Sequence, residues 1–153
     1  MDHIYEKEFD FVISRAKSLD RPARMVVAGA DCENIVKAVF EAEAQGFARP
    51  ILVGNEDRII AVLKKLGLFE RNYVISHVPD YEINTIYHVY MERALTIIND
   101  GLGDILVRGN TSTRNFLMPI LDKKHGLATG LVSEVSLLKV PYYDKGLALS
   151  DVS

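Results

Sequence analysis

The sequence predicts an α/β fold, in which a parallel sheet with flanking helices is followed by a β-hairpin. Between residues 25 and 124, short apolar runs typical of strands buried on both faces alternate with helical patterns. Beyond residue 128, two extended runs flank turn residues instead. Strands that alternate with helices form right-handed βαβ crossovers, so we expect helices on both faces of the sheet.

The first half of the chain predicts five elements. They are a helix at residues 9–16, a strand at 25–29, a helix between Asp31 and Gly46, a strand at 50–54 and a helix between Asn55 and Gly67. Asp31 and Asn55 are of the residue types that cap helix N-termini, and glycine is common just past a helix C-terminus. The second and third of these helices are therefore each bounded by a start and a stop signal.

The second half predicts two further strand–helix units and then the hairpin. The units are a strand at 73–78, a helix between Asp80 and Gly101, a strand at 104–107 and a helix from Asn110 to about Lys124. An antiparallel hairpin is predicted at the end of the chain, from extended runs at 128–140 and 147–151 that turn residues 141–146 join. We expect an α/β domain at residues 1–127 and a hairpin at 128–153 that leads toward a second domain, missing from this chain.

Length and composition are those of one globular domain, or of half a larger enzyme. The chain has 153 residues, of which 48% are hydrophobic and 25% charged. A net charge of −3 offers no basic field for nucleic acid, and no apolar run approaches the ~20 residues that cross a bilayer. The single cysteine, Cys32, cannot form an internal disulfide. We expect a cytoplasmic protein with neither a nucleic-acid nor a membrane partner.

Several common site types are excluded by their missing motifs. The four histidines and Cys32 lack zinc-ligand spacing, so we expect no metal. The turn after the first strand, Ala28–Glu33, lacks two of the three glycines of a dinucleotide fingerprint. Neither a P-loop nor the G-x-S-x-G elbow of serine hydrolases occurs.

The best candidate site is the loop between the fourth strand and the helix that follows it. Its candidate ligand-binding residues are Gly109, Asn110, Thr111, Ser112, Thr113 and Arg114. Unpaired amides, hydroxyls and the positive end of the helix dipole can together hold an oxyanion, and a glycine lets the backbone approach a phosphate closely. The alternative is that Asn110 or Thr111 merely caps the helix and Arg114 is a solvated charge.

Motifs in order along the chain carry a family resemblance. They are Met25–Ala30, Gly46–Gly54, Val107–Thr113, Gly126–Gly130 and Pro141–Asp144. Together they resemble the phosphate acetyltransferase and phosphate butyryltransferase family, and the butyryl branch more closely. Such enzymes convert acyl-CoA and phosphate into acyl phosphate and CoA. The resemblance implies CoA and phosphate as substrates, no cofactor, and a homo-oligomer.

The resemblance also implies a two-domain architecture like that of isocitrate and isopropylmalate dehydrogenases, with the active site between the domains. Thr111, Ser112 and Thr113 would help bind phosphate, and Ser133 would lie near the cleft. This sequence departs from the family at Met118, where relatives commonly have lysine or arginine, and at Glu134, where butyryl-type relatives often have histidine.

Length is the larger departure, because family members are about twice as long. We expect the catalytic residues beyond Ser153, so that this fragment is the N-terminal portion of an acyltransferase and is inactive alone. One alternative is a non-catalytic α/β module that binds phosphate or another anionic metabolite. Another is a truncated paralogue that contributes a dimer surface through Tyr142, Tyr143 and Leu147.

Overall fold

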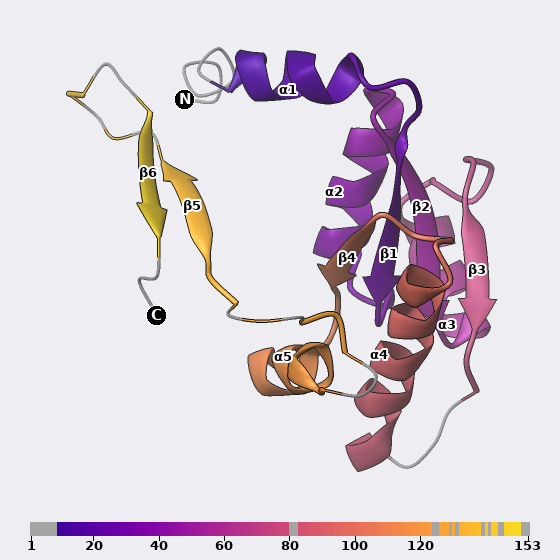
Figure 1. The fold of residues 1–153 in the computed structure, drawn as a ribbon. Coiled ribbons are helices and arrows are strands. Elements are labelled where there is room, and N and C mark those ends of the chain that lie inside the picture. The colour runs from indigo at the N-terminus through magenta and orange to yellow at the C-terminus, as the bar shows by residue number, and fades with distance from the viewer. Residues whose placement is uncertain are drawn as a thin grey trace.

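The computed structural model describes residues 9–79, 83–123, 126–128, 130, 132–138, 140, 142–143 and 146–150. Within these residues the chain forms helices and strands in the predicted alternation (Figure 1). In chain order they are α1 (Asp10–Lys17), β1 (Ala23–Ala28), α2 (Glu33–Ala44), β2 (Ala48–Gly54), α3 (Glu56–Lys65), β3 (Val74–His77), α4 (Ile83–Asn99), β4 (Ile105–Arg108), α5 (Thr113–Leu121), β5 (Val135–Leu138) and β6 (Leu147–Ser150).

Four strands form a parallel sheet in the order β3-β2-β1-β4. The chain first builds outward from β1 through β2 to β3, and then returns to place β4 on the other side of β1. The last two strands, β5 and β6, pair antiparallel in a separate hairpin. The predicted α/β fold, with a parallel sheet, flanking helices and a terminal hairpin, is confirmed.

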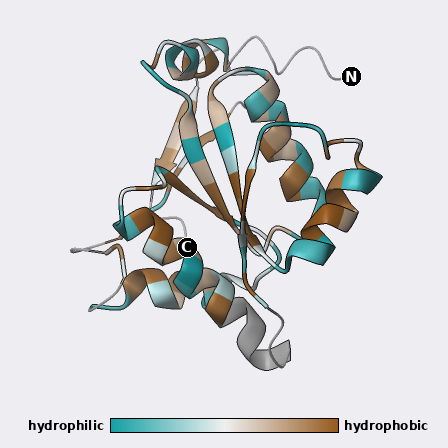
Figure 2. Cartoon of the chain, turned by 90° about the vertical axis from the view of Figure 1, so that its right-hand side faces the viewer, coloured by the Kyte–Doolittle hydropathy of each residue, from teal (hydrophilic) through white to brown (hydrophobic). Residues whose placement is uncertain are grey.

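Helices cover both faces of the parallel sheet, and each face has its own apolar core. Val26 and Val53 pack with α4 on one face, and α5 contributes partly buried residues there. Val27 and Leu52 pack with α2 and α3 on the other face. Neighbouring residues of one strand therefore point into different cores, and the strands read as continuous apolar runs because both faces are buried. Figure 2 shows the hydrophobic colours along the strands and on the helix surfaces turned to them.

Most of the predicted helix ends are confirmed. Gly46, Gly67 and Gly101 follow α2, α3 and α4 with φ of 86°, 68° and 69°, the left-handed conformation that glycine adopts without steric cost. The Asn55 side chain caps α3 by accepting a hydrogen bond from the amide of Arg58 at 3.1 Å. The predicted cap Asp80 lies outside the described residues.

The prediction that Asp31 caps α2 is wrong. Cys32 holds the N-cap position, and its side chain makes no capping hydrogen bond. The Asp31 carboxylate instead lies 3.5 Å from the Arg58 guanidinium of α3, measured from Oδ2 to Nη1. Asp31 therefore forms a tertiary ion pair in place of a local cap. The sequence around Asp31 does not encode this ion pair, because Arg58 lies on another helix.

Helix α5 is shorter than the predicted span from Asn110 to about Lys124. It begins at Thr113, after the N-cap Ser112, and contains Pro119 two residues before its last residue. Proline lacks an amide hydrogen and crowds the preceding turn, so it weakens a helix interior. The alternative in which Asn110 or Thr111 caps this helix is wrong, because Ser112 holds that position.

Candidate functional site

The candidate loop, Gly109–Ser112, lies at the carboxyl edge of the sheet between β4 and α5. Because the chain leaves β1 toward β2 on one side and returns to β4 on the other, the loops after β1 and β4 diverge at this point. Open α/β sheets bind ligands in the crevice that such a reversal of strand order creates. The topology therefore places the predicted residues where a ligand site is expected.

Two backbone hydrogen bonds hold the candidate loop against the loop after β1. The amide of Gly109 donates to the carbonyl of Ala28 at 3.0 Å, and the amide of Asn110 donates to the carbonyl of Gly29 at 2.9 Å. A Cβ at residue 109 would lie 2.1 Å from the Gly29 oxygen. Gly109 is thus needed for this close approach of two loops; its predicted role in approaching a phosphate stays a prediction.

Backbone amides in the first turn of α5 divide into used and available groups. The amide of Thr111 donates to the carbonyl of Gly109 at 2.9 Å, and those of Asn115 and Phe116 donate to the side chain and the carbonyl of Ser112. Between them lie Ser112, Thr113 and Arg114. Within the described part of the chain, the backbone amides of these three residues have no acceptor. Three consecutive free donors at a helix N-terminus are suited to an oxyanion.

The side chains of the loop add hydroxyl donors and positive charge. Ser112 Oγ accepts from the amide of Asn115 at 3.1 Å, which leaves its hydroxyl proton free to donate. Arg108, the last residue of β4, donates from Nη1 to Thr113 Oγ1 at 2.6 Å. Arg114 is exposed and, within the described ranges, has no ion-pair partner. The guanidinium of Arg108 is therefore held at the same helix terminus as the free amides.

Two polar side-chain atoms near this edge are buried without a hydrogen-bond partner in the described structure. They are Thr111 Oγ1 and Asp31 Oδ1. Burying such an atom without a partner costs ~1–3 kcal/mol, so native structures keep few of them. Thr111 was predicted as a site residue, whereas Asp31, just after β1, was predicted only as a cap. The carboxyl edge thus carries, on each of the two loops, one buried polar atom without a hydrogen-bond partner.

Comparisons with known proteins show which proteins this chain is similar to. No family model matches the chain. The chain is 30% identical to the phosphate butyryltransferase of Clostridium acetobutylicum and 32% identical to that of Clostridium beijerinckii, each over 148 residues, which is 96% of this chain and 47% of the relative. It is 26% identical to the phosphate acetyltransferase of Thermotoga maritima over 129 residues, or 84% of this chain and 42% of that protein.

The chain resembles the phosphate acyltransferases.

Solved structures with the same fold have related names. A phosphotransacetylase from Streptococcus pyogenes superposes with a TM-score of 0.62 at 18% identity, over 76% of this chain and 42% of its own. The EutD phosphotransacetylase from Staphylococcus aureus gives a TM-score of 0.63 at 14% identity, over 92% of this chain and 49% of its own. The resemblance predicted from the motifs is confirmed, and the chain spans about half the length of the curated relatives it matches. A non-catalytic binding module is not favoured by these acyltransferase relatives.

Ser133 was predicted to lie near the cleft of a phosphate acyltransferase. It precedes β5 and is exposed, and the hydrogen bonds of the described residues do not join it to the loop. Its neighbour Glu134 accepts a hydrogen bond from Ser136 at 3.2 Å. Met118, at the position where relatives commonly have a basic residue, is 59% exposed on α5. The role of Ser133 stays a prediction.

Sequence reasoning missed Arg108 as a site residue. The residue stands in the motif Val107–Thr113, just after the predicted strand at 104–107, but it was not among the candidate ligand-binding residues. The available signal was its position, because the last residue of a parallel strand lies at the edge where ligands bind.

Among the described residues, no group of three His, Cys, Asp or Glu side chains is arranged to hold a metal ion. No helix in the described part of the chain is long and apolar enough to span a membrane.

Proposed function

We propose that the chain is the N-terminal portion of a phosphate acyltransferase that converts acyl-CoA and inorganic phosphate into acyl phosphate and CoA. One observation supports a phosphate-binding role for this portion of the enzyme. Three free amides and the Ser112 hydroxyl proton stand together at the switch point of a fold that resembles phosphotransacetylases. The loop residues from Gly109 to Arg114 would bind the phosphate or acyl-phosphate group.

In the reaction, a phosphate oxygen attacks the thioester carbonyl carbon, the C–S bond breaks, and the sulfur leaves as the CoA thiolate, which then takes up a proton. The loop would hold the phosphate through amide N–H groups and the Ser112 hydroxyl, with Arg108 supplying positive charge. Fixing both position and charge lowers the barrier, since the attacking oxygen must meet the carbonyl in one orientation.

The second domain and the catalytic residues would lie beyond Ser153, so the 153-residue chain would be inactive alone. We propose an α/β domain at residues 1–127 and a hairpin at 128–153 that leads toward this second domain. The division is supported by the hairpin strands, which pair with each other and not with the parallel sheet. We extend the proposal to an isocitrate-dehydrogenase-like pair of domains with Ser133 near the cleft, and to a cytoplasmic homo-oligomer that needs no cofactor. The single cysteine supports a reducing compartment.

The test is the release of CoA thiol by the protein that continues past Ser153. A thiol-reactive dye would report release from acetyl-CoA and butyryl-CoA with and without inorganic phosphate. We expect release only when phosphate is present, with an acyl phosphate as the second product. Equal rates in both conditions would show hydrolysis and would contradict the proposal.

A further inference from the structure

A second group of arginines lies at the amino edge of the sheet, where the strands begin. Arg24 in β1 and Arg49 in β2 are register partners on neighbouring parallel strands, so their side chains leave the sheet on the same face. Arg21 precedes β1 by two residues. Together with Pro22, these three arginines line a hollow of about 220 Å³.

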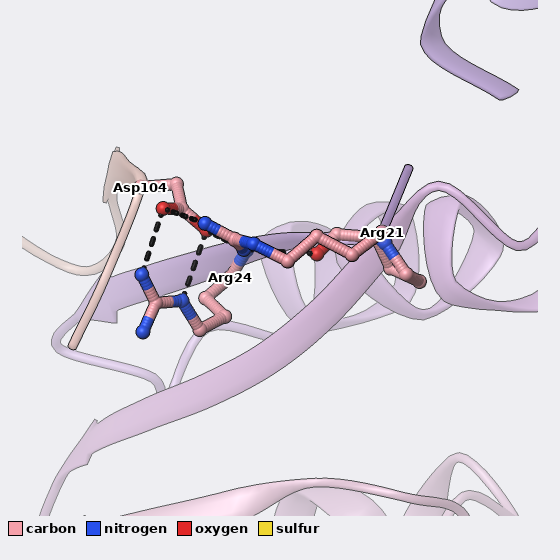
Figure 3. A network of polar contacts seen from close by, with 4 residues as sticks. Arg21, Arg24 and Asp104 are labelled. Carbon is pink, nitrogen blue, oxygen red and sulfur yellow. Dashed lines mark hydrogen bonds and ion pairs between the residues drawn. The ribbon is translucent and has the colours of Figure 1, made fainter. Parts of the chain in front are cut away.

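One carboxylate is shared by two of the arginines. Asp104 accepts hydrogen bonds from Arg21 at 2.6 and 2.8 Å and from the Arg24 guanidinium at 2.9 and 3.0 Å (Figure 3). The amide of Arg24 donates to the same carboxylate at 2.8 Å. Each guanidinium carries five N–H donors, so these bonds fix the arginines in place and leave further donors available.

Arg49 is not neutralised in this way. Its side chain is exposed, and across the described residues it makes neither an ion pair nor a hydrogen bond. The hollow is therefore lined by three guanidinium groups, of which two are bound to the single carboxylate of Asp104, and this leaves an excess of two positive charges. Two of the three are already oriented by Asp104, so an anion would not have to order them.

We propose that this hollow binds a small, doubly charged oxyanion of the phosphate class. Its volume is below the roughly 300–1,000 Å³ of sites for drug-sized ligands, which favours a free ion over a nucleotide or a CoA molecule. The planar fork of arginine matches phosphate oxygens in pairs. The excess charge of two matches a phosphate dianion.

This site is separate from the candidate loop. Arg24 lies five residues before Gly29, which corresponds to ~16 Å along a strand, and the loop stands at the opposite edge of the sheet. One phosphate ion cannot contact both. The site is therefore an additional one, and it does not depend on the proposed acyl transfer.

The experiment is a titration of the 153-residue chain with inorganic phosphate, followed by backbone amide NMR at constant ionic strength set with sodium chloride. We expect saturable shifts at residues 21–24 and 47–49, distinct from any at 109–115. Sulfate should compete, and acetate should bind more weakly because it carries one charge. Arg49→Gln should weaken phosphate binding at this edge by about threefold or more, the scale of an exposed ion pair.

Two matched variants sharpen the result. Arg49→Lys keeps the charge but loses the fork, so its affinity should fall between those of the unmodified chain and Arg49→Gln. Arg114→Gln should leave the shifts at residues 21–24 and 47–49 unchanged. The proposal is overturned if chloride alone reproduces the shifts, if Arg49→Gln binds phosphate as tightly as the unmodified chain, or if the shifts are confined to residues 109–115.

Discussion

The Ser112 hydroxyl illustrates how a single residue can serve both the fold and a ligand. Its oxygen accepts the amide of Asn115, which caps α5, while its proton remains free to donate. Capping and phosphate binding are therefore compatible at this residue. They differ in the quantity that each would change, since a cap contributes to the free energy of unfolding and a ligand contact to affinity.

Ser112→Ala should affect both quantities in the proposed full-length acyltransferase. Loss of the cap should lower the free energy of unfolding by ~1 kcal/mol. Loss of a hydroxyl that donates to a charged phosphate should cost ~1.5–3 kcal/mol, which raises the KM for phosphate tenfold or more. Denaturant midpoints and the phosphate dependence of thiol release measure the two effects.

Asn55→Ala is the matched control, since Asn55 caps α3 with a bond of the same length, 3.1 Å, to the amide of Arg58. It should cost a similar ~1 kcal/mol of stability and leave the KM for phosphate unchanged. If Ser112→Ala behaves like Asn55→Ala in both measurements, Ser112 is a cap alone and does not bind phosphate.

Gly109 gives a second prediction at the level of single residues. A methyl group at this position would lie 2.1 Å from the Gly29 oxygen and 2.6 Å from the Ala28 oxygen, both backbone atoms. Gly109→Ala should therefore force the two loops apart and destabilise the chain by ~2 kcal/mol or more. Gly130→Ala, where nothing lies within 4 Å, should change stability by less than ~0.5 kcal/mol. Equal denaturant midpoints for the two variants would refute the close approach.

At the level of elements, Asp104 joins β4 to β1. Besides its bonds to Arg21 and Arg24, its amide donates to the carbonyl of Arg24 at 2.9 Å. Hydrogen bonds from the Arg21 side chain, the Arg24 side chain and the Arg24 amide hold the pKa of the Asp104 carboxyl well below its usual range. The ionised carboxylate is thus the form that the folded state favours.

This pKa shift predicts how stability depends on pH. The folded-state pKa lies below the unfolded value of ~3.9, so Asp104 contributes its full stabilisation above about pH 4 and loses it as the pH falls further. Asp104→Asn should therefore be less stable than the unmodified chain at pH 7, and the difference should shrink below pH 4. Urea unfolding at pH 7, 4 and 3 measures this. A pH-independent Asp104→Asn difference would contradict the prediction.

The whole molecule has a well-packed sheet and a hairpin that stands apart from it (Figure 1). Val26 and Val27 at the centre of the sheet are fully buried, whereas Val135 in β5 is 70% exposed. A two-stranded hairpin is marginally stable without a face to pack against. The two parts should therefore differ in local stability.

Hydrogen exchange should reveal that difference. We expect the amides of β1 to exchange at least about a hundredfold more slowly than those of β5 and β6, because local opening requires less free energy where little apolar surface is buried. Exchange followed by NMR on the chain measures each amide. Equal protection of β1 and the hairpin would show that the hairpin is packed as firmly as the sheet.

Local sequence signals determined the order of elements and most of their ends. Apolar runs and helical spacing predicted the parallel sheet, and Asn55, Gly46 and Gly67 act as predicted because caps and left-handed turns depend on neighbouring residues. The motifs also predicted the family resemblance, which the relatives confirm. The loop from Gly109 to Arg114 could be proposed as a candidate site because its residues are continuous in the chain.

Tertiary structure alone decided which distant residues meet. Asp104 binds Arg21 across 83 residues, and the loops at Gly29 and Gly109 touch because β1 and β4 are neighbours. Arg58 draws Asp31 away from its expected capping role. The alternation of strands and helices does not encode strand order, because any buried apolar strand can pair with any other. These contacts therefore depend on how the two cores pack against the sheet.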